Sequence, residues 1–316
     1  MRVLVTGGAG FIGSALVDRL LAEGCFVDVV DDLSSGSLAN LADARAYPGR
    51  RFSFQRLDVA NLEIADYIVR KKPEVVFHLA AQADVRVSVA RPGFDAAVNI
   101  GGTVNVLEGC VSAGTTKLCF AASGGTLYGV PHEIPTREAA PWKPESPYGV
   151  SKKAAIDYMH YYREIQGIEY SALALANVYG PRQNPHGEAG VVAMFAGRFL
   201  DRARVTIFGD GHQTRDFVYV DDVVDAMWRS VDRGGGLVLN IGTGIETSVQ
   251  QLHDAIATLT GFHEPARYEA ARIGELRRSA LDPGRAGIHL GWKPFTTLAD
   301  GLARTLEYFK QHRNNR

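Results

Sequence analysis

The feature that most constrains the fold is a glycine-rich turn close to the N-terminus. The apolar run Val3-Leu4-Val5 precedes this turn, and a helical pattern follows at about residues 11–23. Gly7 suits a tight turn, Gly10 lets phosphates approach the backbone, and Gly13 lets the helix pack on the strand. The free N–H groups that begin such a helix attract anions. The turn therefore predicts a dinucleotide site, with a tight turn that binds nothing as the alternative.

Short apolar strand patterns recur after the turn, separated by helical patterns. The further strands are expected at residues 26–30, 52–54, 75–79, 118–122 and 171–175. The helices between them are expected at about 62–71, 95–113 and 148–166. Strands that are apolar on both faces lie inside parallel sheets covered by helices. The sequence thus predicts an α/β fold with a doubly wound parallel sheet of the Rossmann type.

The regular alternation ends near residue 178. Residues 177–188 are rich in Pro, Gly and Asn and predict a loop. We therefore expect residues 1–177 to form the dinucleotide-binding domain, with strands near 215–242 returning to it. Residues 178–316 are expected to form mainly a smaller C-terminal α/β region that binds the substrate.

Composition excludes several classes of protein. The net charge is −1, with 34 basic and 35 acidic residues, so a nucleic-acid partner is not expected. No apolar run is long enough to span a membrane, and no export signal precedes the first strand. The three cysteines suit neither a disulfide framework nor a zinc site, so no metal is expected. A cytoplasmic protein is the expectation.

Acidic residues after the strands indicate which dinucleotide binds. Asp31 ends the second strand, where a carboxylate can accept hydrogen bonds from the adenosine ribose hydroxyls. Asp31 and Asp32 would repel a 2′-phosphate, which favours NAD over its phosphorylated form. Asp58 follows the third strand and is a candidate for contact with the adenine amino group. The alternative for Asp31 is an ordinary acid at the start of a loop, and that for Asp58 is a turn or cap acid.

Tyr148 and Lys152 form the candidate catalytic pair. They stand four residues apart at the start of a predicted helix, which places both on one helical face. An ammonium group and a positive nicotinamide ring would lower the pKa of the tyrosine, so that it exchanges a proton with a sugar hydroxyl. Ser123 ends the preceding strand, where its hydroxyl could face the same atom. By itself, a Tyr-x-x-x-Lys spacing is more often a surface feature.

At this point the chain resembles the extended short-chain dehydrogenase/reductase superfamily, and within it the UDP-glucose (UDP-galactose) 4-epimerases. The resemblance covers nearly the whole chain. The matching segments are Thr6–Gly13, His78–Gln82, Ser146–Lys152, Asn177–Arg182, Arg215–Val218 and Arg272–Glu275.

The resemblance implies a role for each matching residue. Tyr148 is the expected acid/base, and Lys152 its partner and a ligand of the nicotinamide ribose. Asn177 is expected to hold the substrate diphosphate, and Arg215 and Arg272 to clamp it, since guanidinium groups grip phosphate bidentately. Further expected substrate contacts are Phe208 and Ser279. The expected cofactor contacts are Gly7, Gly10, Phe11, Ile12, Gly13, Asp31, Asp32, Asp58, Val59, Leu79, Ala80, Ala81, Asn99, Tyr148 and Lys152.

One segment departs from the pattern of the family. Many relatives carry three serines where this chain reads Ala122-Ser123-Gly124, so that the last serine falls on Gly124. Ser123, Thr126 or a water molecule must then supply the second catalytic hydroxyl, and Ser123 is preferred. Dehydratases and decarboxylases of the superfamily place an acid in this stretch, where this chain has Gly124, Gly125 and Thr126. Dehydration, which needs such a group, is therefore not expected.

The activity that the resemblance implies is NAD-dependent epimerisation at C4 of a UDP-hexose, through a transient 4-keto sugar. The first alternative is a 4-epimerase of UDP-glucuronate or of a UDP-N-acetylhexosamine, because a small Ser279 leaves room for a larger sugar. Arg277 or Arg278 could pair with a carboxylate, although solvent-facing charges are the more common reading. The second alternative is a non-catalytic NAD-binding protein. The resemblance also implies a homodimer, because the helices near 95–113 and 148–166 match those that form the dimer interface in relatives.

Overall fold

The computed structural model describes residues 1–185, 190–271 and 276–312. Its largest element is a seven-stranded sheet in the order β11-β6-β5-β4-β1-β2-β3, in which every printed pairing is parallel. The seven strands are β1 (Arg2–Thr6), β2 (Phe26–Asp31), β3 (Phe52–Arg56), β4 (Val75–His78), β5 (Lys117–Ser123), β6 (Glu169–Leu175) and β11 (Leu237–Ile241). The strand order reverses direction between β1 and β4, which confirms the doubly wound α/β fold.

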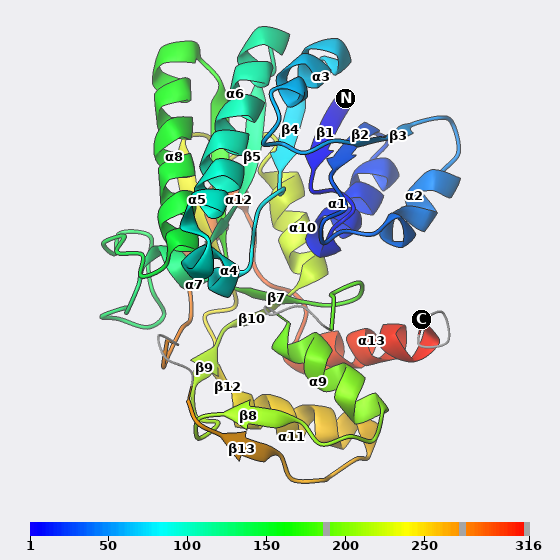
Figure 1. The fold of residues 1–316 in the computed structure, drawn as a ribbon, viewed down its shortest axis with the longest axis vertical. Helices are drawn as coiled ribbons and strands as arrows, with labels where there is room; N and C mark the ends of the chain where they lie inside the picture. Colours follow the sequence, from blue (N-terminus) through cyan, green and yellow to red (C-terminus); the bar gives the residue numbers. More distant parts are fainter. Residues whose placement is uncertain (186–189, 272–275, 313–316) are drawn as a thin grey trace.

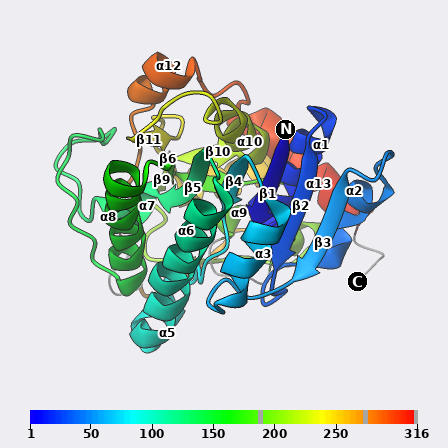
Figure 2. The same cartoon turned by 90° about the horizontal axis from the view of Figure 1, so that it is seen from above.

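Helices cover both faces of this sheet (Figures 1 and 2). One face carries α3 (Glu63–Lys71), α6 (Gly102–Ala113) and α8 (Pro147–Gln166), and the other carries α1 (Phe11–Ala22), α10 (Val220–Arg229) and α12 (Gly284–Leu290). Alternate residues of β1 serve the two layers: Val3 and Val5 belong to one buried core and Leu4 to the other. The sheet is therefore buried on both faces, as its apolar strands require.

Smaller elements cluster at the carboxyl end of the sheet. Figure 1 places the short helices α4 (Val85–Ala90), α5 (Pro92–Ala96) and α7 (Gly124–Leu127) beside the first turns of α8. The remaining short elements of the first half are η1 (Leu38–Leu41), α2 (Ala42–Ala46) and the π-helical turn η2 (Ala97–Gly101). The single helix predicted over 95–113 is thus α5, η2 and α6 in succession.

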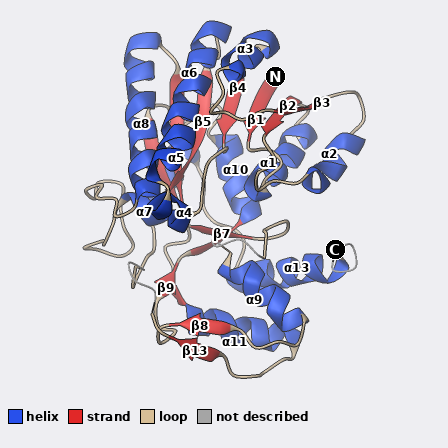
Figure 3. Cartoon of the chain, in the orientation of Figure 1, coloured by secondary structure: helices blue, strands red, loops and turns tan. Residues whose placement is uncertain are grey.

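A second, smaller lobe lies below the large sheet in Figure 3, where it forms a separate group of helices and short strands. It contains α9 (Val191–Leu200), α11 (Val249–Thr260) and α13 (Leu298–Gln311). Three two-stranded sheets accompany them: β7 (Asn177–Tyr179) with β10 (Phe217–Tyr219), β9 (Thr214–Arg215) with β12 (Thr247–Ser248), and β8 (Thr206–Phe208) with β13 (Arg267–Glu269).

Two details differ from the sequence predictions in this part. The start of the loop predicted over 177–188 is the strand β7, because Asn177–Tyr179 finds a parallel partner in β10, far along the chain. Of the strands near 215–242, β11 joins the large sheet beside β6, whereas Thr214–Arg215 and Phe217–Tyr219 pair in the small sheets. Among the described residues, no helix is both long and apolar enough to cross a membrane.

Candidate active site

The glycine turn joins β1 to α1 at the carboxyl edge of the large sheet. Gly7 has a φ of +70°, and a Cβ built on it would lie 2.6 Å from the backbone nitrogen of Ala80. A Cβ on Gly13 would lie 2.1 Å from the Gly7 carbonyl oxygen, so the turn packs tightly on the first turn of α1. Gly10 is different, because its Cβ would meet only the Gly7 carbonyl, at 3.2 Å. A side chain at Gly7 or Gly13 would therefore clash with the protein, whereas there is more space beside Gly10.

The start of α1 has the electrostatics of an anion site. Its N-cap, Gly10, offers no side-chain cap, and no acidic residue lies in its first turn, which is fully described. Phe11 and Ile12 are half-buried there, with Gly13 behind them. N–H groups that the protein leaves without a side-chain acceptor fit the diphosphate of a dinucleotide.

Asp31 closes one side of the turn. It is buried, and its carboxylate accepts hydrogen bonds from the backbone nitrogens of Ala9 at 2.9 Å and Leu33 at 2.8 Å. Burial raises the pKa of Asp31, and these backbone hydrogen bonds oppose the rise. A carboxylate has about four acceptor positions, so two such bonds leave capacity for ribose hydroxyls. Asp32 accepts from Ser34, in a turn of its own.

The residues after β3 and β4 complete this edge. Asp58 accepts a hydrogen bond from the backbone nitrogen of Ala60 at 2.8 Å, which is the turn role that its alternative reading described. Val59 is buried beside Gly102. The half-buried residues Leu79, Ala80 and Ala81 form the loop against which Gly7 packs.

His78 anchors that loop without taking part in proton transfer. Its ring nitrogens lie 2.7 Å from the Thr6 hydroxyl and 3.0 Å from the Thr103 hydroxyl. Burial lowers the pKa of His78 to about 3, with the charge of Lys152 acting in the same direction. The histidine is therefore neutral at ordinary pH and joins β1, β4 and α6.

Asn99 is held by the protein on both sides of its amide. Its Oδ1 accepts from the backbone nitrogen of Gln82, and its Nδ2 donates to the Gln82 carbonyl and to Asp95. Asn99 therefore fixes the loop after β4, and contact between its side chain and the cofactor stays a prediction.

Tyr148 and Lys152 lie together in the first turns of α8. Pro147 starts the helix, and the Ser146 hydroxyl caps it by accepting from the Gly149 nitrogen at 3.1 Å. The Lys152 ammonium lies 5.8 Å from the centre of the Tyr148 ring and donates to the Ala121 carbonyl at 3.0 Å. The structure thus brings together the two residues that the sequence spacing selected.

Burial is the largest influence on the pKa values of this pair. Burial lowers the pKa of Lys152 to about 8, and the charge of Asp95 opposes that shift. The pKa of Tyr148, however, is raised rather than lowered. Burial of the phenol is the largest cause, the Asp95 charge adds to it, and the Ser123 side chain partly reverses it through a hydrogen bond. In the chain alone, a buried phenol next to a carboxylate resists ionisation, so the lowering expected with the nicotinamide ring present stays a prediction.

Ser123 and Thr126 lie at the end of β5 and in α7. Ser123 interacts directly with Tyr148, whereas the Thr126 hydroxyl donates to the Ser123 carbonyl at 3.4 Å. Between them, a Cβ on Gly124 would lie 2.3 Å from Cδ1 of Leu281. The missing serine of the family pattern is therefore a position where the side chain of Leu281 already fills the space.

Three of the predicted substrate residues, Asn177, Phe208 and Arg215, lie in the short strands β7, β8 and β9 of the second lobe. Asn177 pairs in register with Phe217, directly after Arg215 and Asp216. Arg215 donates to the carbonyls of Thr214 at 2.8 Å and Leu276 at 2.9 Å. Arg272 lies outside the described residues. Leu276, which Arg215 contacts, is the first described residue after residues 272–275.

Ser279 and Phe208 lie on either side of Arg215 in the chain. Ser279 is buried and stands two residues before Leu281, which touches Gly124. Phe208 ends β8 and accepts a hydrogen bond at its carbonyl from Gln213 at 2.7 Å.

Arg277 pairs with Asp210, and Arg278 pairs with Glu246, each through two hydrogen bonds. A cavity of about 460 Å³ opens here, lined by Val130, Pro131, His132, Ile134, Glu145, Leu276, Arg277 and Arg278.

Two residues of this region escaped the sequence reasoning. Asp216 is buried, and its carboxylate accepts from the backbone nitrogens of Thr243, Gly244 and Leu281. It therefore ties the segment that carries Arg215 to the one that carries Ser279. Gln213 is 7% exposed, and its Oε1 has no hydrogen-bond partner among the described residues. The position of Asp216 directly after Arg215 in the sequence could have identified it as part of the site. Nothing in the sequence marks Gln213.

Comparison with known proteins agrees with this geometry. Residues 3–242 match the model of the NAD dependent epimerase/dehydratase family. The chain is 49% identical over 311 residues to a UDP-glucose 4-epimerase of Mycolicibacterium smegmatis, covering 98% of this chain and 99% of the relative.

Two solved structures are similar along their whole length. A UDP-glucose 4-epimerase of Thermotoga maritima, solved with UDP-glucose, superposes with a TM-score of 0.95 at 43% identity, covering 99% of this chain and all of that one. A UDP-glucose 4-epimerase of Thermus thermophilus, solved as a complex with NAD, gives a TM-score of 0.90 at 39% identity, covering 98% and 99% of the two chains. From its matched length, its sheet order and its Tyr148–Lys152 pair, this chain belongs to the NAD dependent epimerase/dehydratase family.

Proposed function

We propose that this protein is an NAD-dependent UDP-glucose 4-epimerase that interconverts UDP-glucose and UDP-galactose. The observation that carries the proposal is the meeting of Tyr148, Lys152 and Ser123 with the glycine turn at one edge of the sheet. Full-length relatives with this activity support it. Residues 1–177 would hold the cofactor, and residues 178–316 would hold mainly the nucleotide sugar.

The cofactor would lie across the carboxyl ends of β1, β2 and β4. The open turn at Gly10 and the uncapped start of α1 would take the diphosphate, and Asp31 would accept from the ribose of the adenosine half. Bound NAD would take the hydride from C4 of the sugar and return it to the opposite face of the 4-keto sugar. Its positive ring would also counter the burial that raises the pKa of Tyr148.

The chain's own residues would manage the proton and the position of the sugar. Tyr148 would remove the proton of the 4-hydroxyl and later return it, while Ser123 hydrogen-bonds the same oxygen. Arg215, with Arg272 and Asn177, would hold the diphosphate. The firm grip on the diphosphate leaves the sugar ring able to turn between the two hydride transfers.

The structure bears on the choice of sugar. Ser279 is buried, and a residue as small as serine at this position would leave room for an N-acetylated hexose. The charges of Arg277 and Arg278 are already matched by Asp210 and Glu246, which argues against recognition of the carboxylate of UDP-glucuronate. A UDP-N-acetylhexosamine is therefore the second candidate substrate.

We also propose a homodimer formed through α8. Apolar side chains on its outer face are exposed at Val150, Tyr158, Tyr161 and Ile165, at spacings that place them along one stripe. A stripe of this kind on a helix predicted to lie in an interface fits a second copy of the chain. Sedimentation should give a dimer, and Tyr161→Glu should shift it to a monomer.

A cytoplasmic location would suit the three cysteines, which are buried, unpaired thiols.

The activity is tested by incubating the purified enzyme separately with UDP-galactose, UDP-N-acetylgalactosamine and UDP-glucuronate, and resolving the products. We expect the fastest conversion with UDP-galactose and no net change in NAD. Conversion of none of the three, or accumulation of reduced cofactor in proportion to product, would overturn the proposal. Preference for the acetylated sugar would establish the second candidate.

A further inference from the structure

Asp95, in α5, is a fully buried carboxylate that contacts α8 at Ser151, between Tyr148 and Lys152 in the chain. Its Oδ2 accepts a hydrogen bond from the Ser151 hydroxyl at 2.6 Å. Its Oδ1 accepts from Nε2 of Gln82 and Nδ2 of Asn99, each at 3.0 Å. Three donors converging on one carboxyl group suit its ionised form, which only accepts hydrogen bonds. All three donors are neutral, so the negative charge must be balanced from elsewhere.

Lys152, which follows Ser151 on α8, is the buried cation on which the charge of Asp95 acts. Lys152 is 2% exposed, and its ammonium donates to the Ala121 carbonyl and lies 4.5 Å from the centre of the Phe120 ring. Neither partner carries a charge. A buried ion costs several kcal/mol unless an opposite charge compensates it. The charge of Asp95 favours the protonated form of Lys152, so each group compensates the other.

The hydrogen bonds of Asp95 also join three segments of the site. Ser151 precedes Lys152 on α8, Asn99 lies in the turn η2, and Gln82 lies in the same loop as Leu79–Ala81. Gly7 packs against that same loop. The position of Asp95 therefore couples the helix of the catalytic pair to the loop at the cofactor turn.

We propose that Asp95 is a positioning residue that keeps Lys152 cationic and fixes α8 against the cofactor loop. The inference rests on the proposed function only in giving Lys152 and Tyr148 their roles. Asp95 touches neither substrate nor cofactor in this scheme. It acts through the charge of Lys152 and through the hydrogen bond of Ser151.

The sign of the effect follows from the groups around Lys152. Tyr148 faces it from α8, Asp95 from α5 and the neutral His78 from β4, while β5 contributes an uncharged carbonyl and ring. The charge of Asp95 raises the pKa of both Lys152 and Tyr148. Removing that charge should therefore move both titrations toward lower pH.

The test is Asp95→Asn, which keeps the shape and removes the charge. We expect kcat to fall by about tenfold to a hundredfold, as for a small misplacement of catalytic groups. Both limbs of the pH profile of kcat should move to lower pH. Ser151→Ala should lower kcat without moving the limbs. Asp157→Asn is the matched control, because Asp157 pairs with Lys153 on the exposed side of the same helix.

A second readout does not depend on activity. Tyrosinate absorbance, taken as the difference between each protein and its Tyr148→Phe version, reports the titration of Tyr148 itself. In Asp95→Asn, Tyr148 should ionise at lower pH than in the wild type. An unmoved titration together with unmoved pH limbs would overturn the proposal, even if activity were lost. An inactive wild type would overturn the proposed function instead and would leave this titration readable.

Discussion

Two buried lysines lie at opposite ends of β5, and only one of them belongs to the candidate active site. Lys152 donates to the Ala121 carbonyl near the carboxyl end of the strand, and Lys117 begins the strand. The exposed fractions of the two residues are 2% and 5%, and burial lowers the pKa of both. Burial and a lowered pKa therefore do not distinguish a catalytic lysine from a structural one.

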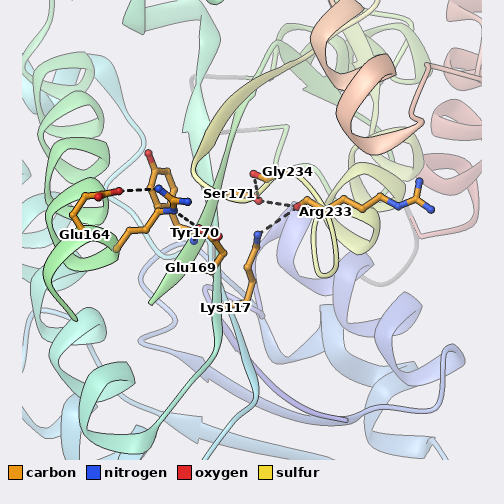
Figure 4. Close-up of polar contacts among 8 residues, drawn as sticks. Lys117, Glu164, Glu169, Tyr170, Ser171, Arg233 and Gly234 are labelled. Carbon is orange, nitrogen blue, oxygen red and sulfur yellow. Dashed lines mark hydrogen bonds and ion pairs between the residues drawn. The ribbon is translucent and has the colours of Figure 1, made fainter. Parts of the chain in front are cut away.

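The surroundings make the distinction. Figure 4 shows Lys117 donating to the Arg233 carbonyl, with Ser171 bonded to the carbonyls of Arg233 and Gly234. These contacts hold the turn before β11 against the amino edge of the sheet. Lys152 instead lies beside the ring of Tyr148 and bonds the Ala121 carbonyl near the carboxyl edge, where the charge of the buried Asp95 acts on it. Ligands of doubly wound sheets bind at that edge, so the same chemistry has a function at only one end of the strand.

The most severe test of this contrast removes the hydroxyl of Tyr148, the tyrosine beside Lys152. Tyr148→Phe should lower kcat by about 10³-fold, because it removes the group that exchanges the proton. The matched control is Tyr170→Phe, which deletes the hydroxyl of a buried tyrosine near Lys117. NAD binding and thermal stability should survive both changes. Equal activity of the two variants would show that the edges are not functionally different.

The lysines themselves give the next largest effect. Lys152→Met should lower kcat by about 10²-fold, since it removes the partner charge of Tyr148. Lys117→Met should change kcat by less than about threefold, because Lys117 begins β5 at the amino edge, away from the edge where ligands of doubly wound sheets bind. Steady-state assays on UDP-galactose measure both. A comparable loss in Lys117→Met would mean that burial, rather than position in the sheet, decides the outcome.

The hydroxyl at the carboxyl end of β5 sharpens the contrast further. Ser123→Ala should lower kcat by about tenfold to a hundredfold, because Ser123 interacts with Tyr148. Thr126→Val should cost less than about threefold, since the Thr126 hydroxyl bonds only a backbone carbonyl. The reverse order of the two variants would assign the second catalytic hydroxyl to Thr126.

Gly124 and Gly125 test how tightly this end of the strand is packed. Gly124→Ala places a methyl group 2.3 Å from Leu281 and should destabilise the fold by about 1–3 kcal/mol, the usual cost of overpacking. Gly125→Ala is its control, because a Cβ there meets nothing within 4 Å. Thermal denaturation measures both. Leu281→Ala should restore part of the stability of Gly124→Ala, and failure to do so would place the strain elsewhere.

Sequence patterns were sufficient for one half of this molecule and not for the other. The strands of the large sheet are continuous apolar runs, and Tyr148 and Lys152 share a helix, so short-range spacing determines them. The strand at Asn177–Tyr179 was missed because its partner, β10, lies some forty residues away and no local signal marks the pair. Gln82, Asp95 and Ser151 meet only through the tertiary fold. Gly124 has no room for a larger side chain because Leu281, far along the chain, occupies that space.

The smallest expected effect is a pH dependence of the folding stability, which the two lysines should share. An unfolded lysine keeps its proton up to its ordinary pKa of 10.5, whereas folded Lys152 loses it at about 8. Between these values the unfolded state binds more protons, so the folded protein gains stability as pH rises. Measured against Lys152→Met by urea unfolding, the wild type should gain about 2 kcal/mol between pH 8 and 10. Lys117→Met should give a difference of the same sign, because burial also lowers the pKa of Lys117. If the two stability differences had opposite signs, burial would not affect the two lysines alike. If they had the same sign while the activities of the two variants differed, position in the sheet would be what distinguishes the lysines.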